Sequence, residues 1–448
     1  MTADFRFASL ACVEILSGLF QLGVGGDLAA FGTYALTGSE AFVLMKPMQT
    51  ARRGSCWRQW STPVRLDPNV DDAIARFPRI AVGAGKIYVV GVEFQLADDR
   101  PMPDNPLHVW GTDGSSIGRP AGHFRYLFPR GAVDAKGRLH LIWGEPASDA
   151  GAVSVRQWYF LPSQTLWTAT FDPTSGWSAP AKLGFTLSGI DGLKWDWRGT
   201  ADTFGSGHAQ GIGLEERRRR RGAPLEYLNL DDSGDWLRSY IAVPRDAGAI
   251  AVVAEGQRIL AFYASTEPDA GLSATESAPV SAIMLHVSRD RGATWESPRL
   301  VALAASGGVR DLHAVAVRDG QLHLVWGEDT PRGAAIRHAF SRDSAATWLV
   351  SADLVLPGKI RNVRSVVDSC GVVHVVGEDW QDGPDHMHID YARFDGAWSE
   401  VEHLFRDRTA MTPDLRLTIS GQPVMVFVAR MSAKPDSRFA TYYSAMQR

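Results

Sequence analysis

The chain has 448 residues, 45% of them hydrophobic, with 46 basic and 50 acidic side chains and a formal net charge of -4. This composition suffices for a large buried core, and a charge balance so near neutrality gives no indication of a nucleic-acid partner. The three cysteines, Cys12, Cys56 and Cys370, are an odd number without metal-ligand spacing. We therefore expect neither a disulfide framework nor a structural zinc site.

Residues 1–55 form a first region, which we expect to be an extension separate from the rest. Its apolar stretch, residues 7–25, is interrupted by Glu14 and has no convincing cleavage site. A signal peptide is therefore not convincing, and we expect a cytoplasmic rather than a secreted protein. Glu14, Gln21 and Asp27 also break any run long enough to span a membrane, so we expect no membrane association.

From residue 56 onward, short β-branched and aromatic runs recur roughly every fifty residues, the period typical of a propeller blade. Each unit contains four such runs separated by turn residues, and the fourth opens at a tryptophan in five units. This pattern predicts an all-β protein, a seven-bladed β-propeller of four-stranded antiparallel blades, with residues 56–448 as one domain. The second strand of six units ends in an acidic residue: Glu93, Glu145, Glu215, Glu267, Glu328 and Glu378.

The last unit is incomplete. It has only three strand-like runs, at residues 415–419, 424–429 and 439–445. Residues 57–66 resemble a fourth strand that has no unit of its own. We therefore predict that this N-terminal strand completes the last blade and closes the ring.

A second motif lies between the third and fourth strands. Residues 288–295 read S-R-D-R-G-A-T-W, and residues 341–348 repeat the motif with Ala345 in place of glycine. The motif resembles the Asp-box, or BNR repeat, of the sialidase-like β-propeller superfamily. Aspartate, serine and threonine bind turn amides, glycine permits a tight backbone and tryptophan packs between blades. We interpret Asp290 and Asp343 as folding elements rather than catalytic groups.

The resemblance also implies a functional expectation. Sialidases of this superfamily have six blades, an arginine triad for the substrate carboxylate, a Tyr/Glu nucleophile pair and an F/Y-R-I-P motif in the first strand. Here the corresponding position reads Phe77-Pro78-Arg79-Ile80, which retains the arginine. Seven units and the lack of a placeable nucleophilic tyrosine indicate that the chain is not a true sialidase. The resemblance implies a role for Arg79 alone, as a ligand of a substrate carboxylate.

Propeller geometry places the starts of first strands and the ends of second strands on one face. The acids named above would lie there together with the arginines of the first strands. These arginines could pair with the acids and join neighbouring blades, or leave one sector open as an anion pocket. The arginines are Arg79, Arg130, Arg310, Arg364 and Arg416.

Three classes of function remain open. The first is a carbohydrate-active enzyme acting on an acidic glycan in the funnel, with two carboxylates among Glu328, Glu378 and Glu145 as acid and base or nucleophile. A lyase variant would use His313 or Tyr263 as its base, with His123 and Tyr126 near the same face. The second is a non-catalytic lectin or interaction propeller, and the third is a biosynthetic enzyme that uses the funnel for a small molecule.

Partner expectations follow from these classes. We expect a monomer that binds an acidic carbohydrate or another small anion, without a cofactor. The only close histidine pair, His386 and His388, lacks a visible third ligand, so we expect no metal. The arginine run at residues 217–221 would lie in a funnel-face loop, either as a solvated segment or as an attractor of polyanions.

Overall fold

The computed structural model describes residues 32–37, 40–45, 56–66, 74–94, 107–122, 127–134, 136–146, 163–188, 198–199, 209–213, 225–230, 236–244, 247–255, 257–265, 281–304, 308–316, 320–330, 333–356, 358–380, 387–434 and 439–448. The chain divides into two compact units, Met1–Arg52 and Arg53–Arg448. In the first unit, β1 (Gly32–Thr37) pairs antiparallel with β2 (Glu40–Met45). Every regular element among the described residues is a strand, and no described helix could cross a membrane.

The described residues of the second unit form seven antiparallel sheets, which we number in chain order. Sheet 1 contains β5 (Ile74–Gly83), β6 (Lys86–Phe94) and β7 (Leu107–Gly111). Sheet 2 contains β8 (Leu127–Val133), β9 (Leu139–Pro146), β10 (Ser163–Asp172), β11 (Gly176–Trp177) and β12 (Ala181–Ser188). Sheet 3 contains β13 (Arg198–Gly199), β14 (Ala209–Gly213), β15 (Leu225–Leu230) and β16 (Trp236–Ile241). Sheet 4 contains β17 (Gly248–Glu255), β18 (Arg258–Ser265), β19 (Ala282–Ser288) and β20 (Arg299–Leu303).

The remaining sheets follow the same order. Sheet 5 contains β21 (Val309–Ala316), β22 (Leu322–Thr330), β23 (Gly333–Ser341), β24 (Leu349–Val350) and β25 (Leu354–Leu356). Sheet 6 contains β26 (Ile360–Val367), β27 (Val373–Asp379), β28 (His388–Phe394) and β29 (Glu402–Leu404). Sheet 7 contains β30 (Ala410–Leu417), β31 (Pro423–Arg430) and β32 (Phe439–Gln447), with the early strands β3 (Gln59–Trp60) and β4 (Val64–Arg65) on its outer edge.

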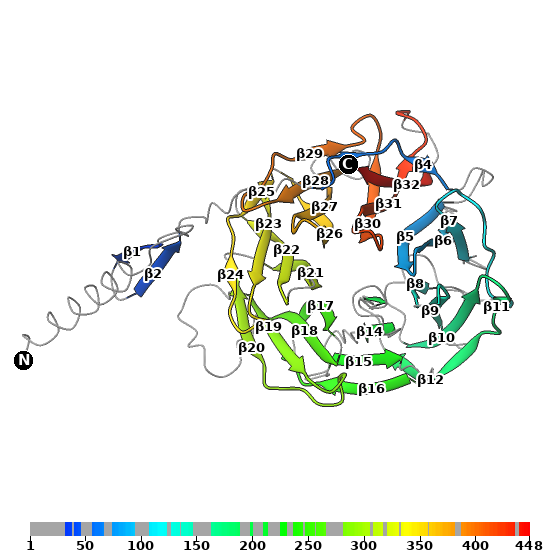
Figure 1. Cartoon of the computed structure of the whole chain (residues 1–448), viewed down its shortest axis with the longest axis horizontal. Coiled ribbons are helices and arrows are strands. Elements are labelled where there is room, and N and C mark those ends of the chain that lie inside the picture. Colours follow the sequence, from blue (N-terminus) through cyan, green and yellow to red (C-terminus); the bar gives the residue numbers. More distant parts are fainter. Residues whose placement is uncertain are drawn as a thin grey trace, which may run out of the picture. The chain divides into compact units, whose positions relative to one another are not determined.

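Strands β5, β8, β17, β21, β26 and β30 lie on the inner side of their sheets (Figure 1). Contacts run from β5 to β8, from β8 to β13, from β14 to β17, and onward through β21, β26 and β30. Strand β30 contacts β5, so the last sheet adjoins the first. Apolar side chains fill the space between neighbouring sheets; between sheets 4 and 5, for example, Phe262, Leu285 and Trp326 belong to one buried cluster. The inner strands therefore surround a common axis.

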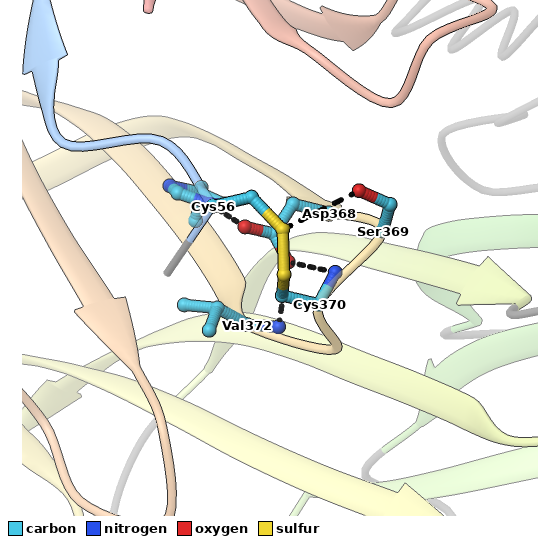
Figure 2. Close-up of a disulfide and its surroundings, with 6 residues drawn as sticks. Cys56, Asp368, Ser369, Cys370 and Val372 are labelled. Atoms are coloured by element: carbon cyan, nitrogen blue, oxygen red, sulfur yellow. Dashed lines mark hydrogen bonds and ion pairs between the residues drawn. A yellow bond between two sulfur atoms is a disulfide. The ribbon is translucent and has the colours of Figure 1, made fainter. Parts of the chain in front are cut away.

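A disulfide joins sheet 7 to sheet 6, contrary to the sequence-based expectation. Cys56, just before β3, is bonded to Cys370, with the two Cα atoms 5.9 Å apart. Figure 2 shows the turn that holds Cys370, in which Asp368 Oδ1 accepts the N–H groups of Cys370 and Val372 at 2.9 Å each. A count of cysteines could not reveal this pair because the two residues are 314 positions apart and meet only once the sheets are assembled.

The two complete motif turns have one hydrogen-bond pattern. Asp290 Oδ1 accepts the N–H of Thr294 at 2.8 Å, and Thr294 Oγ1 donates to Asp290 Oδ2 at 2.6 Å. Asp343 and Thr347 repeat both bonds, at 2.8 and 2.5 Å. Hydrogen bonds from the threonine hydroxyl and amide lower the pKa of Asp290 and of Asp343 to about 2. These contacts are local to each turn, which fits the interpretation of both aspartates as folding elements.

Histidines on the second strands are core residues, as their matching positions indicate. His374 is fully buried and contacts Asp368 and Tyr391 through its two ring nitrogens, at 3.2 and 2.8 Å. His323 Nδ1 lies 3.0 Å from His338 Nε2, and both rings are buried. Burial lowers the pKa of His323 to about 4, and burial also lowers the pKa of His338 well below its usual value.

Candidate functional site

The inner strands share an irregularity at the same axial level. In six sheets the pairing of the first two strands shifts across three residues, as between Arg361 and Arg364 in sheet 6. Such a bulge bends the strand and redirects the side chains that follow it. In four of these strands the first unpaired residue of the bulge is not glycine and yet has a left-handed backbone, with φ from 43° to 52°. These residues are Ala249, Asp311, Asn362 and Thr412.

The bulges divide the five predicted arginines into three levels. Arg79, Arg130 and Arg364 occupy the position that immediately follows the bulge. Arg310 lies before the bulge of its strand, so His313 takes the matching position in sheet 5. In sheet 7 that position belongs to Asp414, and Arg416 follows two residues later. The predicted ring of five equivalent arginines is therefore a mixed ring that also contains a histidine and an aspartate.

Asp414 is the centre of a charge cluster. Its side chain is fully buried and accepts the N–H of Ile80 through Oδ2 at 2.8 Å. Its Oδ1 lies 3.6 Å from Arg364 Nε and 3.7 Å from Arg416 Nη2. Burial alone would raise the pKa of Asp414, but Arg416, Arg79 and Arg364 outweigh it and the pKa is lowered. Asp414 is therefore a permanent anion, unsuited to donate a proton near neutral pH.

Arg79 is the most deeply buried arginine of this cluster, with 8% of its surface exposed. Burial lowers its pKa, and repulsion from Arg130, Arg364 and Arg416 adds to the effect. No described carboxylate lies within ion-pair distance of Arg79, whose Nη1 donates to the carbonyl of Pro78 at 3.2 Å. Three guanidinium groups act on the one buried carboxylate, and Arg130 acts on Arg79 beside it. The described side chains of this cluster therefore carry an excess of positive charge, the electrostatic requirement for an anion site.

The carboxylates that end the second strands do not share one register either. Glu328 pairs with Val309, and the preceding Gly327 pairs with Arg310. In sheet 6 it is Glu378 that pairs with Arg361, so Asp379 occupies the position of Glu328. Successive side chains of a strand point to opposite faces, and Glu378 therefore faces away from the direction of Glu328. Glu145, which follows Gly144 opposite Leu127, matches Glu328.

Glu328 belongs to an ion-pair chain within sheet 5. It is buried, accepts Trp326 Nε1 at 2.8 Å and lies 2.7 Å from Arg337 Nε. Arg337 in turn contacts Asp353 at 3.1 Å. These contacts give Glu328 a structural role, because they join β22 to β23 and to the connection between β24 and β25.

Glu378 has a different environment. Its side chain is 2% exposed, and Oε2 accepts Asn362 Nδ2 at 2.6 Å and the N–H of Thr412 at 3.1 Å. Burial raises the pKa of Glu378, and these two bonds together with the nearby Trp380 oppose the rise only in part. The negative charge of Asp311 raises it further. A buried carboxyl with a raised pKa is the type of group that can act as a general acid.

The predicted bases have other neighbours. His313 Nδ1 accepts the N–H of Ser365 at 3.2 Å and lies 2.9 Å from its hydroxyl, so it links sheets 5 and 6. Tyr263 is buried in the cluster that packs sheet 3 against sheet 4, with its ring stacked on His286. Neither side chain is described in contact with Asp414 or Glu378.

A second titratable pair escaped the sequence analysis. Asp390 on β28 is buried, and its Oδ1 lies 2.7 Å from His403 Nδ1 on β29. Burial and the neighbouring Asp379 raise the pKa of Asp390, and the net value, about 6, is reached despite the opposing effect of His403. Among the described residues, no group of three or more side chains could hold a metal ion.

Several residues singled out by the sequence lie outside the described residues or have undescribed side chains. They are Glu93, Glu215, Glu267, the arginine run at 217–221, His123, Tyr126 and His386.

Comparisons with known proteins give structural likenesses only. No protein-family model matches the chain, and no curated protein matches it. A protein of unknown function from Dyadobacter fermentans is similar at 13% identity and a TM-score of 0.45, covering 87% of this chain and 99% of that one. An α-L-arabinofuranosidase from Fusarium graminearum has 11% identity and a TM-score of 0.44, covering 72% and 95%. The NanB sialidase of Streptococcus pneumoniae has 12% identity and a TM-score of 0.40, covering 87% and 70%. Such low scores transfer neither family membership nor activity.

Proposed function

We propose that residues 56–448 are one seven-bladed β-propeller whose ring is closed by β3 and β4, and that it is a carbohydrate-active enzyme acting on an acidic glycan at the axis. The seven sheets, their successive inner-strand contacts and the pairing of β3 and β4 with β32 support the fold. The observation that supports the function best is the excess of arginines around Asp414, one sheet away from the buried acid Glu378.

The chemistry assigns these groups different tasks. Arg79, with Arg130 and Arg364 at the same level of the inner strands, would bind a sugar carboxylate, because guanidinium groups bind carboxylates through paired hydrogen bonds. Glu378, whose pKa is raised by burial, would protonate the leaving oxygen of a glycosidic bond. Asp414 would hold the arginines in place and would not itself react. Hydrolysis fits better than a lyase reaction, since His313 uses Nδ1 to join two sheets and Tyr263 is in the core.

A non-catalytic anion-binding propeller is the alternative that a specific observation favours. Arg364 and Arg416 already have a carboxylate partner in Asp414, as expected of residues that join sheets. Binding and turnover must therefore be measured separately. The ligand in both cases is a small acidic sugar, bound by a monomer without a cofactor.

The binding experiment compares acidic and neutral sugars. Isothermal titration with glucuronate and galacturonate, against glucose and galactose, should show binding of the acids only. Arg79→Lys and Arg364→Ala should weaken the acids by about 2–5 kcal/mol, since each removes a buried partner of the anion. Arg289→Ala is the matched control, because Arg289 is 73% exposed and paired with Glu296 in a distant turn. Circular dichroism would establish that each variant is folded.

Turnover then separates the two functions. Release of 4-methylumbelliferone from its β-glucuronide and α-galacturonide conjugates should depend on Glu378, and Glu378→Gln should lose it by about 100-fold or more. Acidic sugars that bind without any turnover would favour the non-catalytic alternative. If glucose bound as tightly as glucuronate, the proposed binding of the sugar carboxylate by the arginines would be wrong.

A further inference from the structure

Two consecutive inner strands contact Glu378, and the strand before them carries a carboxyl at the same position. Asp311, Asn362 and Thr412 occupy the same position in the bulges of β21, β26 and β30, and all three have a left-handed backbone. The side chain of Asn362 and the N–H of Thr412 both donate to Glu378. Asp311, from the third strand, is close enough for its charge to act on the same carboxyl. The site therefore contains a second carboxyl that the sequence did not reveal.

The two carboxyls have unequal environments. Glu378 is 2% exposed, whereas Asp311 is only half-buried. Carboxyl pairs in glycoside hydrolysis need this asymmetry, because one group must keep its proton as the acid and the other must be ionised to take one. Asp311 is the more water-accessible carboxyl of the two, whereas Glu328 and Glu145 share the opposite register.

An unmet hydrogen bond lies beside this pair. Thr412 is 8% exposed, and its Oγ1 has no hydrogen-bond partner in the described structure, although its N–H donates to Glu378. A buried hydroxyl without a partner costs free energy that a water molecule or a ligand hydroxyl would recover. A water or a ligand hydroxyl next to Glu378 would satisfy this group.

We propose that Asp311 is the catalytic base of this site and acts together with Glu378 as the acid. This inference rests on the proposed glycoside hydrolysis. Glu378 gives its proton to the glycosidic oxygen as the bond from that oxygen to the anomeric carbon breaks. A water oxygen forms the new bond to the anomeric carbon, and the proton of that water passes to the Asp311 carboxylate. The proton on Asp311 then returns to Glu378 through solvent, so water is the only co-reactant, and the sugar leaves with inverted configuration.

The kinetic test uses 4-methylumbelliferyl β-glucuronide with Asp311→Asn, Glu378→Gln and the control Asp353→Asn, an exposed acid bound to Arg337. Asp311→Asn should lower kcat/KM by about 100-fold or more and remove the ascending limb of the pH profile, which reports the base. Glu378→Gln should remove the descending limb instead. Azide needs no base, so it should restore turnover to Asp311→Asn and give a glycosyl azide of inverted configuration. Wild-type kcat/KM in Asp311→Asn, or a product of retained configuration, would overturn the proposal.

A second measurement does not depend on turnover. Infrared difference spectra should show the C=O band of a protonated carboxyl that is absent in Glu378→Gln. In Asp311→Asn this band should disappear at lower pH, because the like charge that favours the protonated form has been removed. An unchanged midpoint would mean that Asp311 does not face Glu378, and the proposal would fail. If the titration midpoint of the band shifts but no conjugate is turned over, Asp311 and Glu378 do interact and the proposed hydrolysis is wrong.

Discussion

The carboxylate of Asp414, in sheet 7, accepts the backbone N–H of Ile80, in sheet 1, at 2.8 Å. His313 has the same relation to Ser365 between sheets 5 and 6. In both cases the residue that follows the bulge holds the next inner strand through an acceptor atom. At Asp414 the acceptor also carries the charge that the arginines face. The contact that joins the last sheet to the first and the contact that orders the anion site are therefore made by one side chain.

Replacement of Asp414 tests this dual role. Asp414→Asn keeps an acceptor for Ile80 but removes the buried negative charge that faces Arg364 and Arg416. We expect a loss of about 3–5 kcal/mol of unfolding free energy in urea, the cost of leaving buried charges without their partner. Because the pKa of Asp414 is lowered in the folded state, its stabilisation is present above its unfolded pKa and is lost as the pH falls toward its folded pKa.

The control for this measurement is Asp353→Asn, which breaks a more exposed ion pair and should cost less than about 1 kcal/mol. Equal losses in both variants would mean that the cluster contributes no more than a surface pair.

The buried pair His323 and His338 should make stability fall in mild acid. Both pKa values are lowered by burial, to about 4 for His323, so the unfolded chain binds protons first as the pH drops below about 6.5. The stabilisation is complete above that pH, and His323 alone should lose about 3 kcal/mol on the way to pH 4. Denaturant melts at steps of pH would show the slope, and the double variant His323→Phe, His338→Phe should flatten it. If the dependence of unfolding free energy on pH is unchanged in the double variant, other groups cause the acid sensitivity.

The aspartate of each motif turn should matter to stability and not to the site. Asp290→Ala removes the acceptor of two hydrogen bonds from Thr294, so the melting temperature should fall while binding of glucuronate stays unchanged. Since the pKa of Asp290 is about 2 in the fold, its contribution is present above its unfolded pKa of about 3.9 and is lost only as the pH falls through about 2. Loss of binding with an unaltered melting temperature would contradict the structural role.

Reduction of the disulfide should weaken the closure of sheet 7. Strands β3 and β4 pair with β32 over only two residues each, so Cys56–Cys370 is a large part of what holds this edge. The double variant Cys56→Ser, Cys370→Ser should lose about 2–5 kcal/mol, and wild type in dithiothreitol should match it. Cys12→Ser is the control. Three reactive thiols in the native protein would contradict the bond between Cys56 and Cys370.

The sequence predicted the strands better than their register. The repeat period and the tryptophan-led fourth strands indicate successive antiparallel sheets because a sheet needs only a local alternation of apolar and polar side chains. Residues 57–66 could be assigned to the last sheet because that sheet lacked a strand. The disulfide could not be predicted, since its two cysteines come from different sheets.

The candidate site was harder to predict because a bulge adds a residue without leaving a sequence signal. Glu328 and Glu378 both follow glycine and appear equivalent, yet their pairing partners place them on opposite faces. Asp311 and Thr412 carry no motif, and only the left-handed backbone of their strands identifies them. Arg79, Arg130 and Arg364 could be predicted because each stands at the start of a first strand, a position that the repeat itself defines.

The bond between Cys56 and Cys370 also changes the topology of the chain. It closes a covalent loop of the chain that begins just before β3, contains sheets 1 to 5 and ends in the first turn of sheet 6. A single protease cut within that covalent loop would leave one molecule on a non-reducing gel and two on a reducing gel. New chain ends placed in a surface loop between Cys56 and Cys370 would therefore leave the two pieces of the chain covalently joined through the sulfur atoms.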